Sequence, residues 1–181
     1  RFLPVAHEGN DRSSPEEAAV IADRVSELLA SDYESDDAEA ARLTPDDIMV
    51  VAPYNAQVDR LRRALPDRVR VGTVDKFQGQ EAPVVFFSMT TSSGEDVPRN
   101  LAFLLSLNRL NVAVSRARAL AIVVASPELL SVRCRSLGDM RLASALCLLA
   151  EIAESQTRGS EHDDEAVGQL SLLLDAGLDG P

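Results

Sequence analysis

Residues 71–89 read VGTVDKFQGQEAPVVFFSM, and the rest of the expected fold is arranged around this stretch. Val69 to Val74 (VRVGTV) is short and rich in β-forming residues, which predicts a buried strand. Val84 to Met89 (VVFFSM) is apolar without alternation, which is typical of a strand covered on both faces. Asp75 to Pro83 (DKFQGQEAP) forms a polar elbow between them. This order predicts a ligand-binding edge of a parallel sheet, although an ordinary surface loop fits the same residues equally well.

The elbow contains one glycine, Gly79, among polar side chains. Glycine lets the backbone approach a ligand closely because it has no Cβ. Its neighbours Gln78, Gln80 and Glu81 carry amide donors and a carboxylate acceptor. The elbow is therefore a candidate ligand contact.

A second stretch, residues 108–118 (NRLNVAVSRAR), favours the ligand-binding interpretation. Asn108 can cap a short helix, and Arg116 and Arg118 directly precede the apolar strand expected at Ala119 to Ala125. Such arginines are usually solvated, but here they lie between two apolar elements, where a charge is costly without a purpose. A guanidinium fork at a sheet edge is well suited to binding phosphate.

The segments TVDKFQGQE and RLNVAVSRAR, in this order, resemble motifs V and VI of superfamily 1 helicases. They are most similar to the 1B branch, which includes the nonsense-mediated-decay helicase, senataxin and the immunoglobulin-mu-binding helicase, and some bacterial members joined to a RecB-like nuclease. Ile48 to Gln57 (IMVVAPYNAQ) is similar to motif IV of that branch. The resemblance extends to about Leu130 and implies the second, C-terminal RecA-like domain of a helicase motor.

The resemblance implies a nucleotide-binding role for five residues. Arg116 corresponds to an arginine finger on the γ-phosphate of ATP, and Arg118 is a second candidate that could equally be structural. Gly79 would bring backbone close to the γ-phosphate. Gln78 would sense the state of the nucleotide, and Glu81 would hydrogen-bond its ribose.

Motifs IV and V supply the remaining candidates. By resemblance, Tyr54 stacks on adenine and Gln57 supports that corner, while the alternative for Tyr54 is a half-buried packing side chain. Val58 stands where the family often has an arginine, so a phosphate contact from motif IV is not expected. Thr73 and Asp75 are candidates for the nucleic-acid side of motif V, with Thr73 reaching a backbone phosphate.

The sequence contains no GxxxxGK[ST] phosphate loop, and its only lysine, Lys76, is in a different context. The acidic pair Asp46-Asp47 precedes its strand and is expected to form a turn, so no metal ligands are predicted in this chain. ATP and Mg²⁺ would be held mainly by an N-terminal RecA-like domain of the same parent chain. This chain alone is predicted to be inactive as an ATPase.

Composition sets broader limits. The chain has 181 residues, a one-domain length, and a net charge of −11. It has no apolar run long enough for a bilayer and no signal peptide, so no membrane partner is expected. Cys134 and Cys147 are far from any histidine in sequence, which disfavours zinc and a disulfide framework and favours the cytoplasm. A first residue Arg1, rather than Met, suggests a piece of a longer protein.

Charge is unevenly distributed. Residues 31–47 form an acidic insertion that is expected to be mobile, and residues 156–181 form an acidic, flexible tail. Pro53 to Arg135, in contrast, holds twelve cations and seven acids, which is compatible with contacts to a phosphate backbone. Three of these cations are expected to be the solvated face of a helix: Arg60, Arg62 and Arg63.

The expected fold is an α/β domain over residues 1–155, with a mostly parallel sheet flanked by helices, RecA-like but lacking its own Walker A loop. Ser14 and Glu17 are expected to form a capping box at the start of the first helix, and Asp139 to cap the last. Further strands are expected at 1–6 and 48–52, and helices at 15–30, 55–65, from Ser126 and at 140–155.

The expected function is that of a motor domain of an ATP-dependent helicase or translocase on single-stranded DNA or RNA. One alternative is an inert RecA-like adaptor that serves a nuclease or another partner, which the presence of both Arg116 and Glu81 disfavours. A second alternative is a stand-alone nucleotide-binding enzyme, which the missing phosphate loop disfavours.

Overall fold

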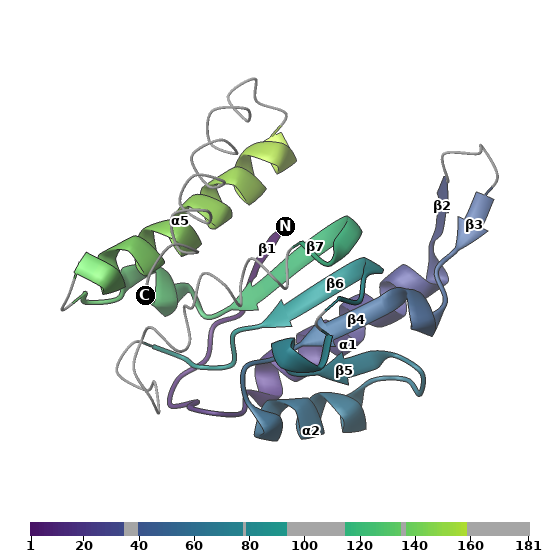
Figure 1. Cartoon of the computed structure of the whole chain (residues 1–181), viewed down its shortest axis with the longest axis horizontal. Helices are drawn as coiled ribbons and strands as arrows, with labels where there is room; N and C mark the ends of the chain where they lie inside the picture. The colour runs from purple at the N-terminus through teal and green to yellow at the C-terminus, as the bar shows by residue number, and fades with distance from the viewer. Residues whose placement is uncertain (35–39, 78, 94–114, 135–136, 159–181) are drawn as a thin grey trace.

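The architecture is a five-stranded, entirely parallel sheet in the order β1-β7-β6-β4-β5 (Figure 1). A computed structural model of the chain describes residues 1–34, 40–77, 79–93, 115–134 and 137–158. The sheet confirms the predicted α/β class. Its strands are β1 (Phe2–Pro4), β4 (Ile48–Val51), β5 (Arg70–Gly72), β6 (Ala82–Ser88) and β7 (Ala117–Ala125).

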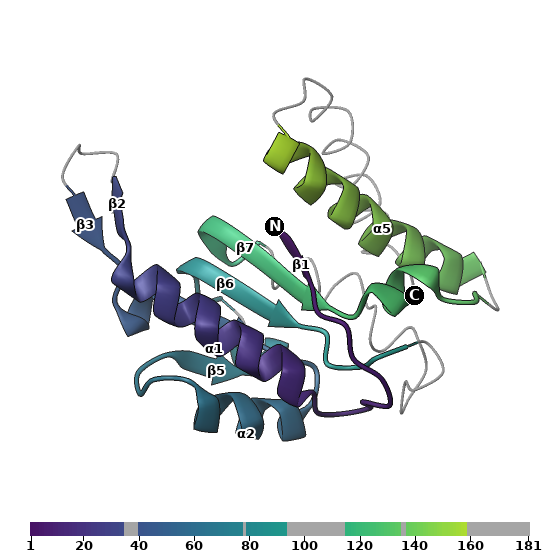
Figure 2. The ribbon, with the colours of Figure 1, turned by 180° about the vertical axis from the view of Figure 1, so that it is seen from behind.

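The helices α1 (Pro15–Ala30) and α2 (Asn55–Ala64) lie side by side across one face of the sheet (Figure 2). Alternate residues of β4 belong to two different core clusters. Ile48 and Val50 belong to the cluster that includes buried residues of α1 and α2. Met49 and Val51 belong to the cluster that includes Leu146. The sheet is therefore covered on both faces, which explains its continuous apolar strands. Leu146 belongs to the helix α5 (Leu137–Arg158).

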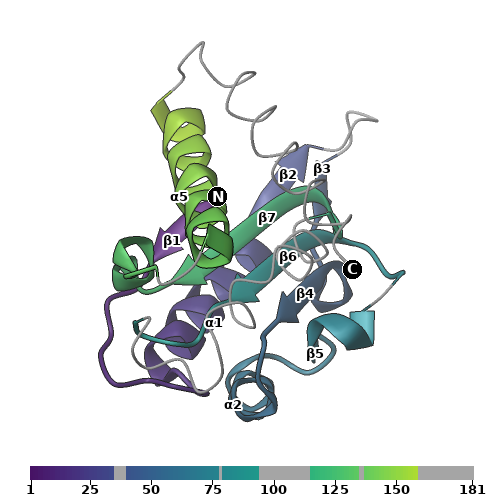
Figure 3. The ribbon, with the colours of Figure 1, turned by 60° about the vertical axis from the view of Figure 1, so that its left-hand side comes forward.

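The helix α5 contacts β1 and the short 3₁₀ helix η3 (Pro127–Ser131), on the side of the sheet away from β5 (Figure 3). It begins at Leu137, so Asp139 lies inside its first turn and is not the predicted cap. Most of the predicted tail lies outside the described residues, and so do the predictions made for residues 94–114. No helix among the described residues is long and apolar enough to cross a membrane.

The start of α1 corrects one prediction. Ser14 does cap the helix, because its Oγ accepts the backbone N–H of Glu17 at 3.0 Å. Glu17 does not complete a capping box, since its carboxylate turns into the core and accepts from Ser88 and Thr90. The backbone N–H of Ser14 donates instead to Gln57 Oε1 at 2.8 Å.

Part of the acidic insertion forms regular secondary structure. It contains an antiparallel pair of strands, β2 (Asp32–Glu34) and β3 (Ala40–Arg42). In their register Asp32 lies opposite Arg42. The pair at residues 46 and 47 forms the turn that was predicted, as part of the 3₁₀ helix η1 (Pro45–Asp47).

Candidate functional site

The parallel strands divide the candidate residues between two edges of the sheet. Tyr54 and Thr73 follow the ends of β4 and β5 at the carboxyl edge, whereas Glu81 and Arg116 precede β6 and β7 at the amino edge. The elbow must cross between these edges because β5 and β6 run in the same direction. The two ends of motif V therefore lie at opposite edges of the sheet, Thr73 at the carboxyl edge and Glu81 at the amino edge.

At the amino edge Glu81 and Arg116 directly precede the neighbouring strands β6 and β7. The backbone N–H of Ala82 donates to the carbonyl of Arg116 at 2.9 Å, and Ala82 lies opposite Ala117 in the register. Arg116 is partly buried, and its Nε is buried without a hydrogen-bond partner among the described residues. A buried donor without a partner is costly, so this guanidinium is a candidate for binding an acceptor from outside the chain.

Arg118 lies at an irregularity of β7. The register runs from Ala82 opposite Ala117 to Val84 opposite Leu120, so β7 has one more residue than β6 over this interval. Such a bulge changes the direction in which side chains point and is common beside functional sites. Arg118 is exposed there.

Asp47 adds a carboxylate to the amino edge. Its Oδ2 accepts from Thr44 Oγ1 at 2.7 Å and from the Thr44 backbone N–H at 2.8 Å. These hydrogen bonds, and then the positive charges of Arg118 and Arg70, hold the pKa of Asp47 below its ordinary value. Arg70 also donates from Nη2 to the carbonyl of Glu81 at 3.1 Å. The amino edge therefore combines three arginines with two carboxylates.

Gly79 stands in an open part of the elbow. Its φ is +80°, in the left-handed region that favours glycine, and a Cβ built on it would meet no atom within 4 Å. Its backbone is thus open to close approach from outside. Gln78 lies outside the described residues.

The carboxyl edge is more tightly packed. Gln57 is fully buried, and its amide accepts from the Ser14 N–H at 2.8 Å and donates to the Ser14 carbonyl at 3.1 Å and to Ser88 Oγ at 3.0 Å. Tyr54 is 8% exposed and belongs to the same core cluster as Val74 and Phe77. Both side chains therefore contribute to packing.

The 3₁₀ helix η2 (Val74–Phe77) starts directly after Thr73. The carbonyl of Thr73 accepts the backbone N–H of Lys76 at 3.0 Å, and Thr73 itself is half-buried. Asp75 is exposed in the first turn. Thr73 and Asp75 thus lie together at the carboxyl edge, away from Arg116.

A buried polar cluster at the carboxyl edge was missed by the sequence analysis. His7 Nε2 lies 3.0 Å from Glu17 Oε1, and Glu17 Oε2 accepts from Ser88 Oγ at 2.5 Å and from the backbone N–H of Thr90 at 2.9 Å. The sequence had one signal for it. Glu17 is four residues before the buried Ile21, so it belongs to the buried face of α1.

No group of three or more His, Cys, Asp or Glu side chains in the described ranges could hold a metal ion. The chemistry available is that of arginines and backbone amides at the amino edge, which can bind phosphate oxygens.

A family profile described as an AAA domain matches residues 5–128 of this chain. The chain is 39% identical over 105 residues to the mov-10-B.1 protein of Danio rerio, which is named as a helicase; the match covers 50% of this chain and 10% of that protein.

Two other relatives carry helicase names. The DNA polymerase alpha-associated DNA helicase A of Schizosaccharomyces pombe is 37% identical over 112 residues, covering 60% of this chain and 15% of that protein. The DNA replication ATP-dependent helicase/nuclease JHS1 of Arabidopsis thaliana is 33% identical over 129 residues, covering 70% and 9%. The matched part of the chain thus spans 9–15% of the length of these relatives. It belongs to the AAA domain family and is a superfamily 1 helicase domain of the type found in the nonsense-mediated-decay helicase.

Proposed function

We propose that this chain is the C-terminal motor domain of an ATP-dependent helicase or translocase on single-stranded DNA or RNA. The observation that carries the proposal is the position of Glu81 and Arg116 directly before the adjacent strands β6 and β7, with a buried Arg116 Nε that has no partner among the described residues. A guanidinium held at a domain edge can reach the γ-phosphate of a nucleotide bound to a second domain.

The amino edge fits a nucleotide that is held mainly by another domain. Arg116 would contact the γ-phosphate, the open backbone of Gly79 would approach it, and Glu81 would accept from the ribose. Gln78 and Arg118 are proposed as further contacts at this edge. ATP with Mg²⁺ would supply the phosphoryl group, and we propose that its binding falls mainly to an N-terminal RecA-like domain of the parent chain, because this chain contains no GxxxxGK[ST] phosphate loop.

The carboxyl edge is proposed to face the nucleic acid through Thr73 and Asp75. The adenine contact predicted for Tyr54 is not part of this proposal, because Tyr54 is buried at the carboxyl edge, away from Glu81 and Arg116. Gln57 would act through packing, because its amide ties the start of α1 to the end of β6. With nucleic-acid contacts at one edge and nucleotide contacts at the other, ATP binding and hydrolysis would change the affinity of the domain for the nucleic acid.

A nuclease partner is proposed on the name of one relative alone. One relative, JHS1, is named as both helicase and nuclease. A RecB-like nuclease domain in the same parent protein is therefore a specific partner to look for.

The test is ATP hydrolysis by the full-length parent protein, with and without single-stranded nucleic acid, comparing wild type with Arg116→Ala. Arginine fingers are worth about 10³–10⁵-fold in turnover, so we expect Arg116→Ala to lose most strand-stimulated hydrolysis while it still binds ATP. Arg63→Ala, an exposed arginine on α2, is the matched control and should hydrolyse ATP at the wild-type rate. Wild-type turnover in Arg116→Ala would contradict the finger and favour the adaptor alternative.

A further inference from the structure

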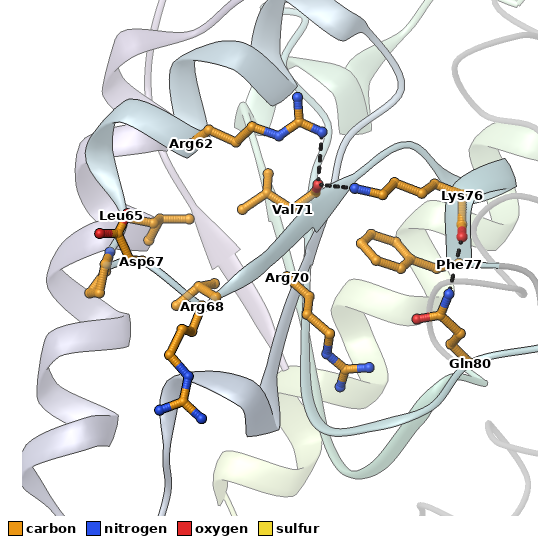
Figure 4. Close-up of a pocket in the computed structure, with 11 residues that line it drawn as sticks. Arg62, Leu65, Asp67, Arg68, Arg70, Val71, Lys76, Phe77 and Gln80 are labelled. Carbon is orange, nitrogen blue, oxygen red and sulfur yellow. Dashed lines mark hydrogen bonds between the residues drawn. The ribbon is translucent and has the colours of Figure 1, made fainter.

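An open pocket of about 420 Å³ lies along the outer edge of β5, the last strand of the sheet (Figure 4). Its walls are the end of α2, the turn that follows it, β5 itself and η2. Of the three amino-edge arginines, Arg70 lines this β5 pocket, whereas Arg116 and Arg118 do not.

The β5 pocket is strongly cationic although the chain as a whole has a net charge of −11. Four cations and a single acid, Asp67, line it. Arg62 forms an ion pair with Asp59, and Arg68 forms one with Asp46, both acids lying outside the lining. All four side chains of these pairs are about half exposed or more, and ion pairs at such exposed positions are weak in water. The lining cations are Arg62, Arg68, Arg70 and Lys76.

Two of these cations converge on one backbone oxygen and still have free donors. Arg62 Nη2 lies 3.2 Å and Lys76 Nζ 3.5 Å from the carbonyl of Val71, as Figure 4 shows. The second distance is long for a hydrogen bond. A guanidinium has five N–H donors and an ammonium three, and the described residues provide no acidic partner for Lys76. The pocket therefore has positive charge and N–H donors available to an anion.

The same contacts exclude an added β-strand as the occupant. The carbonyl of Gly72 accepts the backbone N–H of Ala52, the residue that follows β4, so it points toward β4. Because successive carbonyls of a strand point in opposite directions, the carbonyl of Val71 points to the outer side of β5. An added strand would need that oxygen as an acceptor, but Arg62 already donates to it and the Lys76 ammonium lies beside it. Cations placed on an edge strand are a known obstacle to further pairing.

Gly72 provides the room for Lys76. A Cβ at position 72 would lie 2.7 Å from Lys76 Cδ and 3.0 Å from the ring of Phe77. The absence of a side chain at position 72 is therefore what allows the lysine stem to lie against β5 and its ammonium to reach the pocket.

We propose that the β5 pocket binds a backbone phosphate of the single-stranded nucleic acid, through Arg62 and Lys76. This rests on the proposed function, because Lys76 follows Asp75 in η2 and the pocket so continues the surface proposed to face the strand. A free phosphate or a nucleotide phosphate has the same chemistry, and the experiment separates these sources.

The experiment measures the binding of a fluorescent single strand to the full-length parent protein as a function of salt. Each phosphate contact on a single strand contributes about −0.7 to the slope of log K against log[salt]. We expect the double variant Arg62→Gln/Lys76→Gln to make this slope shallower by about 0.7. The conservative variant Lys76→Arg should keep the wild-type slope.

Arg63→Gln is the matched control, because Arg63 is on the same helix but does not line the pocket. A slope for the double variant that equals the control value, with an unchanged melting temperature, would overturn the pocket assignment alone. If the wild type itself binds no strand, the proposed function fails as well. Competition by millimolar inorganic phosphate, without any effect of the double variant on strand binding, would identify a free-phosphate site and also overturn the proposal.

Discussion

His7 Nε2 lies 3.0 Å from Glu17 Oε1, and both side chains are fully shielded from solvent. His7 precedes α1 and Glu17 belongs to its first turn, while the other Glu17 oxygen binds Ser88 and Thr90 after β6. One carboxylate thus connects the start of α1 to the chain that leaves β6 toward residues 94–114. This connection is a consequence of packing and not of neighbouring sequence.

We predict that Glu17→Ala destabilises the protein by about 3–5 kcal/mol. It would leave the buried donors Ser88 Oγ and Thr90 N–H without an acceptor, at about 1–3 kcal/mol each, besides the contact with His7. Glu27→Ala, which removes an exposed carboxylate from the same helix, should cost less than about 1 kcal/mol. Urea denaturation of both variants measures this, and equal losses would contradict the structural role of Glu17.

We predict that Asp47 stabilises the fold above the pKa of an unfolded aspartate. Hydrogen bonds from Thr44 lower its pKa in the folded state, so this stability is present at neutral pH and is lost as the pH falls through the folded pKa. Thr44→Val removes the hydroxyl donor and should raise the pKa of Asp47 toward its ordinary value, while Thr44→Ser should not. An NMR titration of the Asp47 carboxyl measures it, and a lowered pKa in Thr44→Val would contradict the assigned cause.

We predict that Gly79→Ala reduces strand-stimulated ATP hydrolysis by more than its effect on stability explains. The left-handed φ of Gly79 costs about 1–2 kcal/mol for a residue with a Cβ. Gly9→Ala is a matched control, because Gly9 has a φ of +69° and equally open surroundings. Similar melting temperatures with reduced turnover in Gly79→Ala alone would support close approach of the backbone to the nucleotide. Equal turnover in the two variants would argue against it.

We predict that Gly72→Ala disturbs η2 and the β5 pocket together. The new methyl group would collide with Lys76 Cδ and the Phe77 ring, and overpacking of this kind costs about 1–3 kcal/mol. The lysine stem can move away, whereas the buried ring has less freedom. Thermal melting should therefore show a loss of stability, and strand binding should weaken. Wild-type behaviour in both measurements would mean that η2 adjusts freely.

The sequence predicted the elements well where the signals are local. The apolar run after Ala82, the proline that follows Ser14 and the glycine of the elbow each depend on neighbouring residues, and the structure has β6, α1 and a left-handed turn at these places. Resemblance in short motifs was sufficient for the family. The bounds moved by one to three residues where helix or strand ends depend on packing, as at the start of α5.

The sequence by itself determined the parallel α/β class, the helicase family and the set of candidate residues, because apolar runs, turns and motifs are properties of neighbouring positions. Only the tertiary structure decided how those candidates are grouped. The direction of β5, β6 and β7 places Thr73 at one edge and Glu81 with Arg116 at the other. The burial of Glu17 and the charge of the β5 pocket likewise arise from residues far apart in sequence, which only long-range packing brings together.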